Sequence, residues 1–185
     1  MSKPTREEIL KYVIDVIDGK IINPLHPGLV YSQLKESHGK NRSPEIDKLI
    51  LKQGGALGES WCMYFCQSIL DVIELRFDCK IDLPEGGSTQ KFYNTTKEQY
   101  KHYLAKPLTI VIWKKYADPS LGHAALCLSY FDEHKEFRTF EGNTQNDTKE
   151  LKRNGDGAYY RTRELEYPNM HLRGFVDIYE AIKFK

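Results

Sequence analysis

Cysteine and histidine are the residue types in this sequence whose pairing could support nucleophilic chemistry. The chain has four cysteines, Cys62, Cys66, Cys79 and Cys127, and six histidines. A thiolate is a strong nucleophile, and a nearby histidine can act as the base that generates it. The cysteines form no CxxC pair and no Cys/His cluster with zinc-ligand spacing, so the sequence favours a cysteine–histidine pair over a metal site.

Cys62 has the sequence context that most favours a nucleophile. It follows Ser60-Trp61 and falls in the first turn of a helix predicted to start near Ser60. Unpaired backbone amides and the positive end of the helix dipole at such a position lower the pKa of a thiol and raise its thiolate fraction. The alternative is that Cys62 is a buried structural cysteine.

The other three cysteines are predicted to lie in the core. Cys66 is one helical turn beyond Cys62 and shares a face with Ile69, so it is the weaker candidate for a nucleophile on this helix. Cys79 and Cys127 occur in apolar or strand-like segments, which favours a packing role for both.

His123 is the histidine best placed to act as the base. Gly122 permits a bend before it, and residues 124–128 predict a strand. His123 is therefore expected at the mouth of a strand, held by a rigid element and exposed at its tip, although a plain surface histidine is the alternative. Three further histidines lie in segments predicted to be solvated: His26, His102 and His134.

Glu141 and Asn143 are predicted to support the imidazole of His123. They end a strand that forms a hairpin with the His123 strand across a turn at about residues 131–135. Because they are two apart in an extended segment, both would share one face and could orient the ring. Glu141 is expected to be the direct partner, since only a carboxylate adds charge, and Asn143 a secondary one. A solvated strand end with a turn-forming Gly-Asn is the alternative.

An α+β architecture is predicted to position these side chains, with helices first and strands later in the chain. Helices are expected after a Thr5/Glu8 capping box, after Ser43-Pro44, near Ser60, and over about residues 89–103. Strands are expected at about residues 108–113, 122–130, 136–140, 159–162 and 175–179, with a long polar loop at 144–156.

Composition and charge indicate one ordinary globular domain over residues 1–185. Apolar residues make up 40% and charged residues 29%, which excludes a disordered chain, and the net charge of +1 gives no reason to expect nucleic acid or an anionic membrane as a partner. The first residues, MSKPTREEIL, lack the apolar region of a secretory signal. The expected location is the cytoplasm, or a compartment reached by a route that needs no cleavable signal.

The order of these residues, a helix-start cysteine, then a strand histidine, then a polar residue on the adjoining strand, is the papain-type order. The segments Trp61-Cys62-x-x-Phe65, Gly122-His123-Ala124 and Glu141-x-Asn143 resemble the CHAP family of cysteine- and histidine-dependent amidohydrolases and peptidases. These enzymes are relatives of the NlpC-type papain-like peptidases. Residues 41–47 and 172–177 also resemble segments of such enzymes, so the resemblance covers roughly residues 5–180.

The resemblance implies a papain-like fold, in which the nucleophile helix packs on a C-terminal antiparallel sheet, and hydrolysis of an amide bond in bacterial cell-wall peptidoglycan. It implies Cys62 as nucleophile, His123 as general base, and Glu141 and Asn143 as supporting residues, with no metal or organic cofactor. The substrate would be peptidoglycan or a peptide. An acyltransferase or thioesterase with the same pair, and a non-catalytic binding module with an inert Cys62, are the alternatives.

Overall fold

The computed structural model describes residues 3–146, 155–165, 167 and 169–185. Its helices are α1 (Arg6–Ile17), α2 (Pro44–Lys52), α3 (Cys62–Phe77), α4 (Thr89–Thr95) and α5 (Ile178–Ala181), with 3-10 turns at Tyr31–Gln33 and Glu98–Tyr100. Its strands are β1 (Cys79–Ile81), β2 (Lys101–His102), β3 (Thr109–Lys115), β4 (Gly122–Cys127), β5 (Phe137–Thr144), β6 (Gly157–Arg163), β7 (Met170–Asp177) and β8 (Ile182–Phe184). The architecture is mixed α+β, as predicted.

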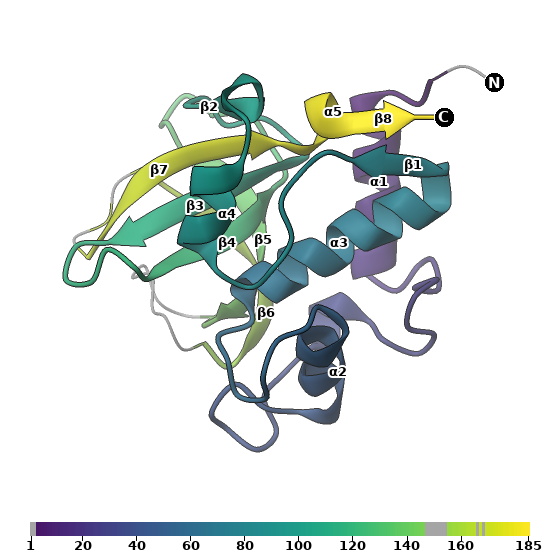
Figure 1. Ribbon diagram of the computed structural model, residues 1–185, viewed down its shortest axis with the longest axis vertical. Helices are drawn as coiled ribbons and strands as arrows, with labels where there is room; N and C mark the ends of the chain where they lie inside the picture. The colour runs from purple at the N-terminus through teal and green to yellow at the C-terminus, as the bar shows by residue number, and fades with distance from the viewer. Residues whose placement is uncertain (1–2, 147–154, 166, 168) are drawn as a thin grey trace.

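Six strands form one antiparallel sheet in the order β2-β7-β3-β4-β5-β6. β4 and β5 are neighbours, as the predicted hairpin requires, and their register places Leu126 opposite Phe140. β1 and β8 pair separately, which brings the C-terminal strand beside the far end of α3 (Figure 1). The sheet thus carries the predicted histidine strand in its interior, with a neighbour on each side.

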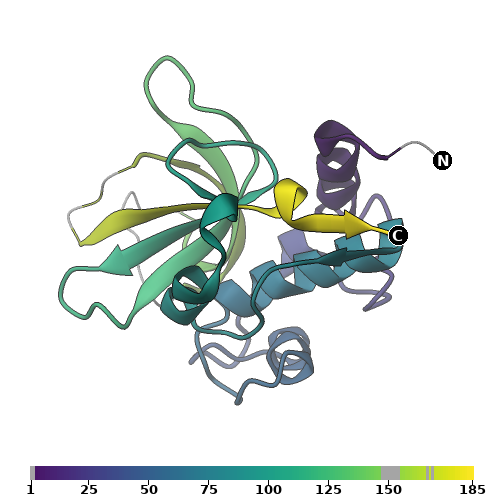
Figure 2. The same cartoon turned by 45° about the horizontal axis from the view of Figure 1, so that its top comes forward.

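Helices α1, α2 and α3 gather on one side of the six-stranded sheet (Figures 1 and 2). α3 contacts β4 and β5 of the sheet and also α1 and α2. Every side chain from Cys62 to Leu70 is buried. The first half of α3 is therefore held by packing rather than by its own propensity, so the first turn of α3 has a fixed position relative to β4 and β5.

Local sequence signals account for the ends of α1 and α2. The Thr5 hydroxyl accepts a hydrogen bond from the Glu8 amide and the Glu8 carboxylate accepts one from the Thr5 amide, so the predicted capping box is present. Ser43 caps α2, and a proline follows it. Gly19 and Gly54 come after the two helices with φ values of 73° and 74°, in the left-handed region that glycine adopts without strain.

The fourth helix is shorter than predicted. α4 ends at Thr95, where the Thr95 and Thr96 hydroxyls bond to backbone carbonyls of the preceding turn. Residues 101–102 leave the helical path to pair with β7, so tertiary pairing overrides the polar helical pattern there. The segment predicted as a strand at 175–179 divides between β7 and α5, and the three-residue strands β1 and β8 had no sequence signal. Most of the loop predicted at 144–156 lies outside the described residues.

Candidate active site

Cys62 is the first residue of α3, which places it in the first turn of the helix, as predicted. Trp61 precedes it, and within the described chain no side chain caps this helix and no acidic residue occupies its first turn. Helix starts are usually satisfied by a Ser, Thr, Asp or Asn side chain. Here the amides of the first turn and the positive end of the helix dipole remain available to a negative charge at Cys62.

Gly142 allows the start of α3 to lie close to the sheet. A Cβ atom at this position of β5 would be 2.6 Å from the Trp61 ring and 2.8 Å from the Cβ of Phe65, which is closer than real side chains approach. The glycine stands between Glu141 and Asn143 in the sequence. It therefore lets the strand that carries the supporting residues pass directly against the helix that carries the cysteine.

His123 is the second residue of β4 and is only 1% exposed. The prediction of an exposed ring tip is wrong, because the imidazole lies against Trp113, its cross-strand partner on β3, with ring centres 6.0 Å apart. Its Nε2 is 3.0 Å from Oε2 of Glu141. Its Nδ1 is buried and has no hydrogen-bond partner among the described residues, so Nδ1 is the ring nitrogen that could exchange a proton with the Cys62 thiol.

Glu141 is fully buried and receives several hydrogen bonds besides that of His123. Arg163 Nε and Nη2 donate to its two carboxylate oxygens at 2.7 and 2.6 Å, and Thr139 Oγ1 donates to Oε1 at 2.6 Å. A bidentate guanidinium–carboxylate pair fixes orientation as well as charge. The carboxylate that holds His123 is therefore itself held in place from two strands.

The charges of these groups support one another. Burial raises the pKa of Glu141, but Arg163 and His123 outweigh it and hold that pKa well below its usual range. Burial lowers the pKa of His123, but Cys62 and Glu141 raise it to about 9. Burial raises the pKa of Cys62, but the neighbouring His123 imidazole, with two backbone amides, brings it below the usual 9.0. The arrangement therefore favours the charged forms of both groups, the Cys62 thiolate and the His123 imidazolium, more than an isolated thiol and imidazole would.

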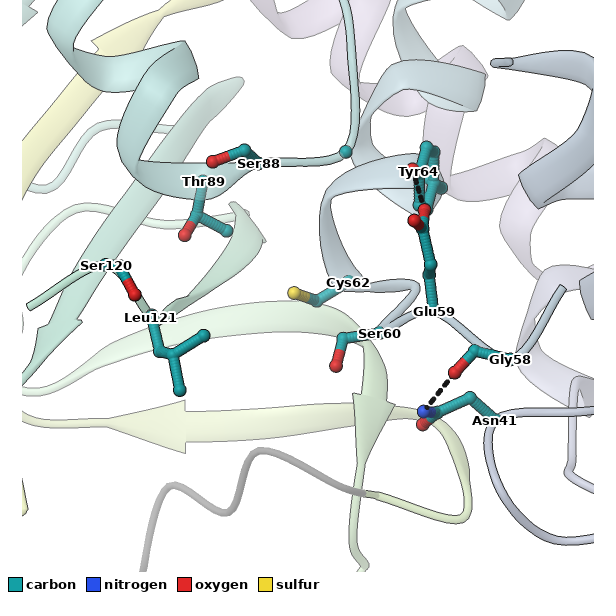
Figure 3. Close-up of a pocket in the computed structure, with 12 residues that line it drawn as sticks. Asn41, Gly58, Glu59, Ser60, Cys62, Tyr64, Ser88, Thr89, Ser120 and Leu121 are labelled. Carbon is teal, nitrogen blue, oxygen red and sulfur yellow. Dashed lines mark hydrogen bonds between the residues drawn. The ribbon is translucent and has the colours of Figure 1, made fainter. Parts of the chain in front are cut away.

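Cys62 opens onto a pocket of about 660 Å³. Figure 3 shows its Sγ pointing into this space, toward the side lined by Thr89, Ser120 and Leu121. The other walls come from the segment just before α3 and from the start of α4. The thiol is therefore backed by buried partners on one side and approachable on the other, which is the placement that a nucleophile needs.

Asn143 is buried but does not share the extended geometry of Glu141. Its φ is 57°, and the register of β5 against β6 shifts between Glu141 and Thr144. This irregularity removes the two-residue alternation from which a shared face was predicted. The Asn143 Oδ1 accepts a hydrogen bond from the Gly155 amide at 3.0 Å, which ties β5 to the residues before β6. A catalytic role for Asn143 stays a prediction.

The other three cysteines are buried in the core, as predicted. Burial raises the pKa of the Cys66 thiol well above its usual value, and it raises the pKa of Cys79 and of Cys127 to about 11. All four cysteines lie within the described residues, and Cys62 alone has a lowered pKa. The choice of Cys62 over Cys66 is thus supported by electrostatics as well as by position.

Of the three histidines that were predicted to be solvated, one is exposed and two are not. His134 is exposed, as expected, with a side chain 75% accessible. His26 and His102 are half-buried, so the prediction that they are solvated is wrong. The His102 ring stacks on Phe175 at 5.8 Å, because its segment joins the sheet as β2 and does not continue a helix.

Arg163 belongs to the site but had not been predicted there. It is 1% exposed at the end of β6, and besides Glu141 it contacts the Thr144 hydroxyl at 3.2 Å. In the sheet register Arg163 stands opposite Phe137, which is four residues before Glu141 on β5. Only a long side chain can reach from Arg163 diagonally across the strands to Glu141. The available signal was an arginine at the end of a predicted strand. Its partner could not be predicted, because the register of β6 against β5 cannot be derived from the sequence across the long loop that precedes β6.

Comparison with known proteins leaves the chain without a family assignment, since no protein-family model and no curated protein matches it. Within the described residues, no group of three or more His, Cys, Asp and Glu side chains could hold a metal ion. In the same part of the chain, no helix combines the length and apolar character that crossing a membrane requires. The chemistry must therefore be inferred from the site itself.

Proposed function

We propose that this chain is a cysteine-dependent amide hydrolase, a peptidase or amidase that cuts bacterial peptidoglycan through an acyl-enzyme. One observation carries the proposal: Cys62, with a lowered pKa, opens onto a pocket and is backed by the buried pair of His123 and Glu141. Such a set of nucleophile, base and orienting group activates a thiol for attack on an acyl carbon. In the alternative, a non-catalytic module, Cys62 is buried and inert. Cys62 is only 4% exposed, so its place in the lining of the pocket is what favours catalysis.

In the proposed reaction the Cys62 thiolate attacks the carbonyl carbon of the amide. The oxyanion develops at the start of α3, where the backbone amide of Cys62 can donate to it. The proton on Nδ1 of His123 passes to the leaving amine, the C–N bond breaks, and a thioester remains on Cys62. Water then attacks the thioester as His123 takes its proton, which releases the acid and regenerates the thiolate beside the imidazolium. Glu141 stays ionised and keeps the Nε2–H of His123 directed at itself.

Peptidoglycan is proposed as the substrate on the strength of the CHAP resemblance. The three segments that carry it now meet at one site, at the start of α3, the start of β4 and the end of β5. A helix carrying the cysteine packed on an antiparallel sheet also supports a papain-like fold. The hydroxyl-bearing residues Ser60, Ser88, Thr89 and Ser120 line the pocket, which suits a substrate rich in peptide amides.

Digestion of purified peptidoglycan, with mass analysis of the released fragments, tests the proposal. The wild-type chain is expected to release fragments with new amine and carboxyl ends, and Cys62→Ala to release none. Cys66→Ala is the matched control: it should stay active and lose on the order of 1 kcal/mol of stability, since it removes a small buried side chain. No release by the wild type, or full release by Cys62→Ala, would contradict the proposal. Turnover only with an added acceptor amine or alcohol would indicate an acyltransferase.

A further inference from the structure

The pocket beside Cys62 carries an acidic side chain, Glu59, and no Lys or Arg lines it among the described residues. Glu59 precedes Cys62 by three residues, and Figure 3 shows both on one wall. Arg42 is a nearby cation, with its Cδ 3.9 Å from where a side chain on Gly58 would begin. Arg42 is paired with Asp47 through hydrogen bonds of 2.7 and 2.9 Å, so its charge is compensated by that carboxylate.

Tyr64 holds Glu59 in position. Its hydroxyl donates a hydrogen bond to Oε2 of Glu59. The phenol ring is confined between Gly55 and Gly87, because a Cβ atom at either glycine would overlap it. Burial and the neighbouring carboxylate raise the pKa of Tyr64 to about 12, so the phenol remains a donor at neutral pH. Glu59 is thus an exposed carboxylate whose direction is set before any ligand arrives.

We infer that Glu59 forms a subsite for a primary ammonium group, so that the preferred acyl donors carry a free amine close to the bond that is cut. The inference rests on the proposed function, because it names a substrate class for the same site. A fixed carboxylate makes charge-assisted hydrogen bonds to an ammonium group. A pocket with charge of one sign also concentrates ligands of the opposite sign and repels those of the same sign.

Methanethiosulfonate reagents of opposite charge test this subsite without requiring hydrolysis. The Cys62 thiolate attacks the sulfenyl sulfur, a disulfide forms, and methanesulfinate leaves with the electron pair of the broken S–S bond. The 2-ammonioethyl and 2-sulfonatoethyl reagents are compared by the rate of mass addition at low ionic strength, with Cys62→Ala as the blank. The measured quantity is the ratio of the cation rate to the anion rate.

Glu59→Gln keeps an acceptor for the Tyr64 hydroxyl and removes only the charge. We expect it to lower the cation-to-anion rate ratio by about fivefold or more at low ionic strength. Glu7→Gln makes the same charge change on an exposed position of α1 and should leave the ratio as in the wild type. An unchanged ratio in Glu59→Gln, or an equal fall in both variants, overturns the subsite.

The same experiment separates the subsite from the proposed function. If Cys62 reacts with neither reagent, the activated thiol is absent, and both the function and the subsite fail. If the rate ratio depends on Glu59 but peptidoglycan and matched peptide amides stay intact, the subsite is supported and the hydrolase proposal is contradicted. If hydrolysis occurs, the wild type should prefer a peptide amide with a free amine over its N-acetylated form, and Glu59→Gln should lose that preference.

Discussion

The acidity of Cys62 depends on one neighbour. Cys66 lies one turn deeper on the same helix and is also buried, and burial raises the pKa of its thiol well above the usual value. At Cys62 burial acts in the same direction, but the neighbouring His123 imidazole, with two backbone amides, reverses the result. The two thiols therefore differ because only one of them meets an imidazole that Glu141 keeps charged.

The pH dependence of Cys62 alkylation follows from these shifts. A lowered thiol pKa means that the thiolate persists as the pH falls below 9.0, while a histidine pKa near 9 keeps the imidazolium beside it through neutral pH. Iodoacetamide should therefore modify Cys62 rapidly at pH 7, with the inflection of the rate profile below that of a free thiol. Glu141→Gln removes the charge that stabilises the imidazolium, so the inflection should move to higher pH.

Glu133→Gln is the matched control for this measurement, since it makes the same charge change on an exposed residue. Its profile should coincide with that of the wild type. A wild-type inflection at or above the free-thiol value would contradict the thiolate–imidazolium pair. An unshifted profile in Glu141→Gln would show that Glu141 does not tune the pair.

The residues predictable from the sequence are those with a local signal. Cys62 stands at a helix start, His123 follows a glycine before a strand, and Glu141 lies on the hairpin partner of that strand. The burial of His123 and the departure of Asn143 from extended geometry had no such signal. The first depends on Trp113 from another strand, and the second on a β-bulge fixed by pairing with β6.

At the scale of elements, the ion pair between β5 and β6 keeps the site in register. Arg163 on β6 and Glu141 on β5 are both buried, and each compensates the other's charge. Arg163→Met would leave the carboxylate buried without its main partner. We expect a loss of about 3–5 kcal/mol in the free energy of unfolding, measured by urea denaturation.

The double variant Glu141→Met with Arg163→Met separates this penalty from a loss of packing. With both charges gone, nothing is left uncompensated, so the double variant should be more stable than Arg163→Met alone. A single variant within about 1 kcal/mol of the wild type would mean that the pair contributes little to the fold. A double variant less stable than the single one would point to packing.

A second prediction at the scale of elements concerns the contact between β5 and α3. Gly142→Ala places a methyl group where the Trp61 ring already lies, at 2.6 Å, so the helix start or the strand must shift. Overpacking of this kind should cost about 1–3 kcal/mol, measured by urea denaturation, and the shift should slow alkylation of Cys62. Wild-type stability together with a wild-type alkylation rate would mean that the close approach has no role in placing the thiol.

At the scale of the whole molecule, the sequence pattern predicted the α+β composition and the hairpin of β4 with β5, but not the other strand pairings. β3 lies between β4 and β7, so the sheet is completed by a strand from the end of the chain, and β8 returns to pair with β1. Such long-range pairings follow from the register and packing of distant segments. Helix starts and hairpin order are encoded over a few residues, which is why they were predictable.

The helix that carries Cys62 and the strands that carry its partners thus come from different halves of the chain and are joined by one core. Trapping of the acyl-enzyme tests most directly whether this assembly is a cysteine hydrolase. Acid quenching during turnover of soluble peptidoglycan fragments, followed by peptide mapping, should reveal an acyl group on Cys62 that neutral hydroxylamine removes. The adduct should be absent from Cys62→Ala and retained in Cys66→Ala. An acyl group on a different residue, or cleavage that continues in Cys62→Ala, would contradict the account.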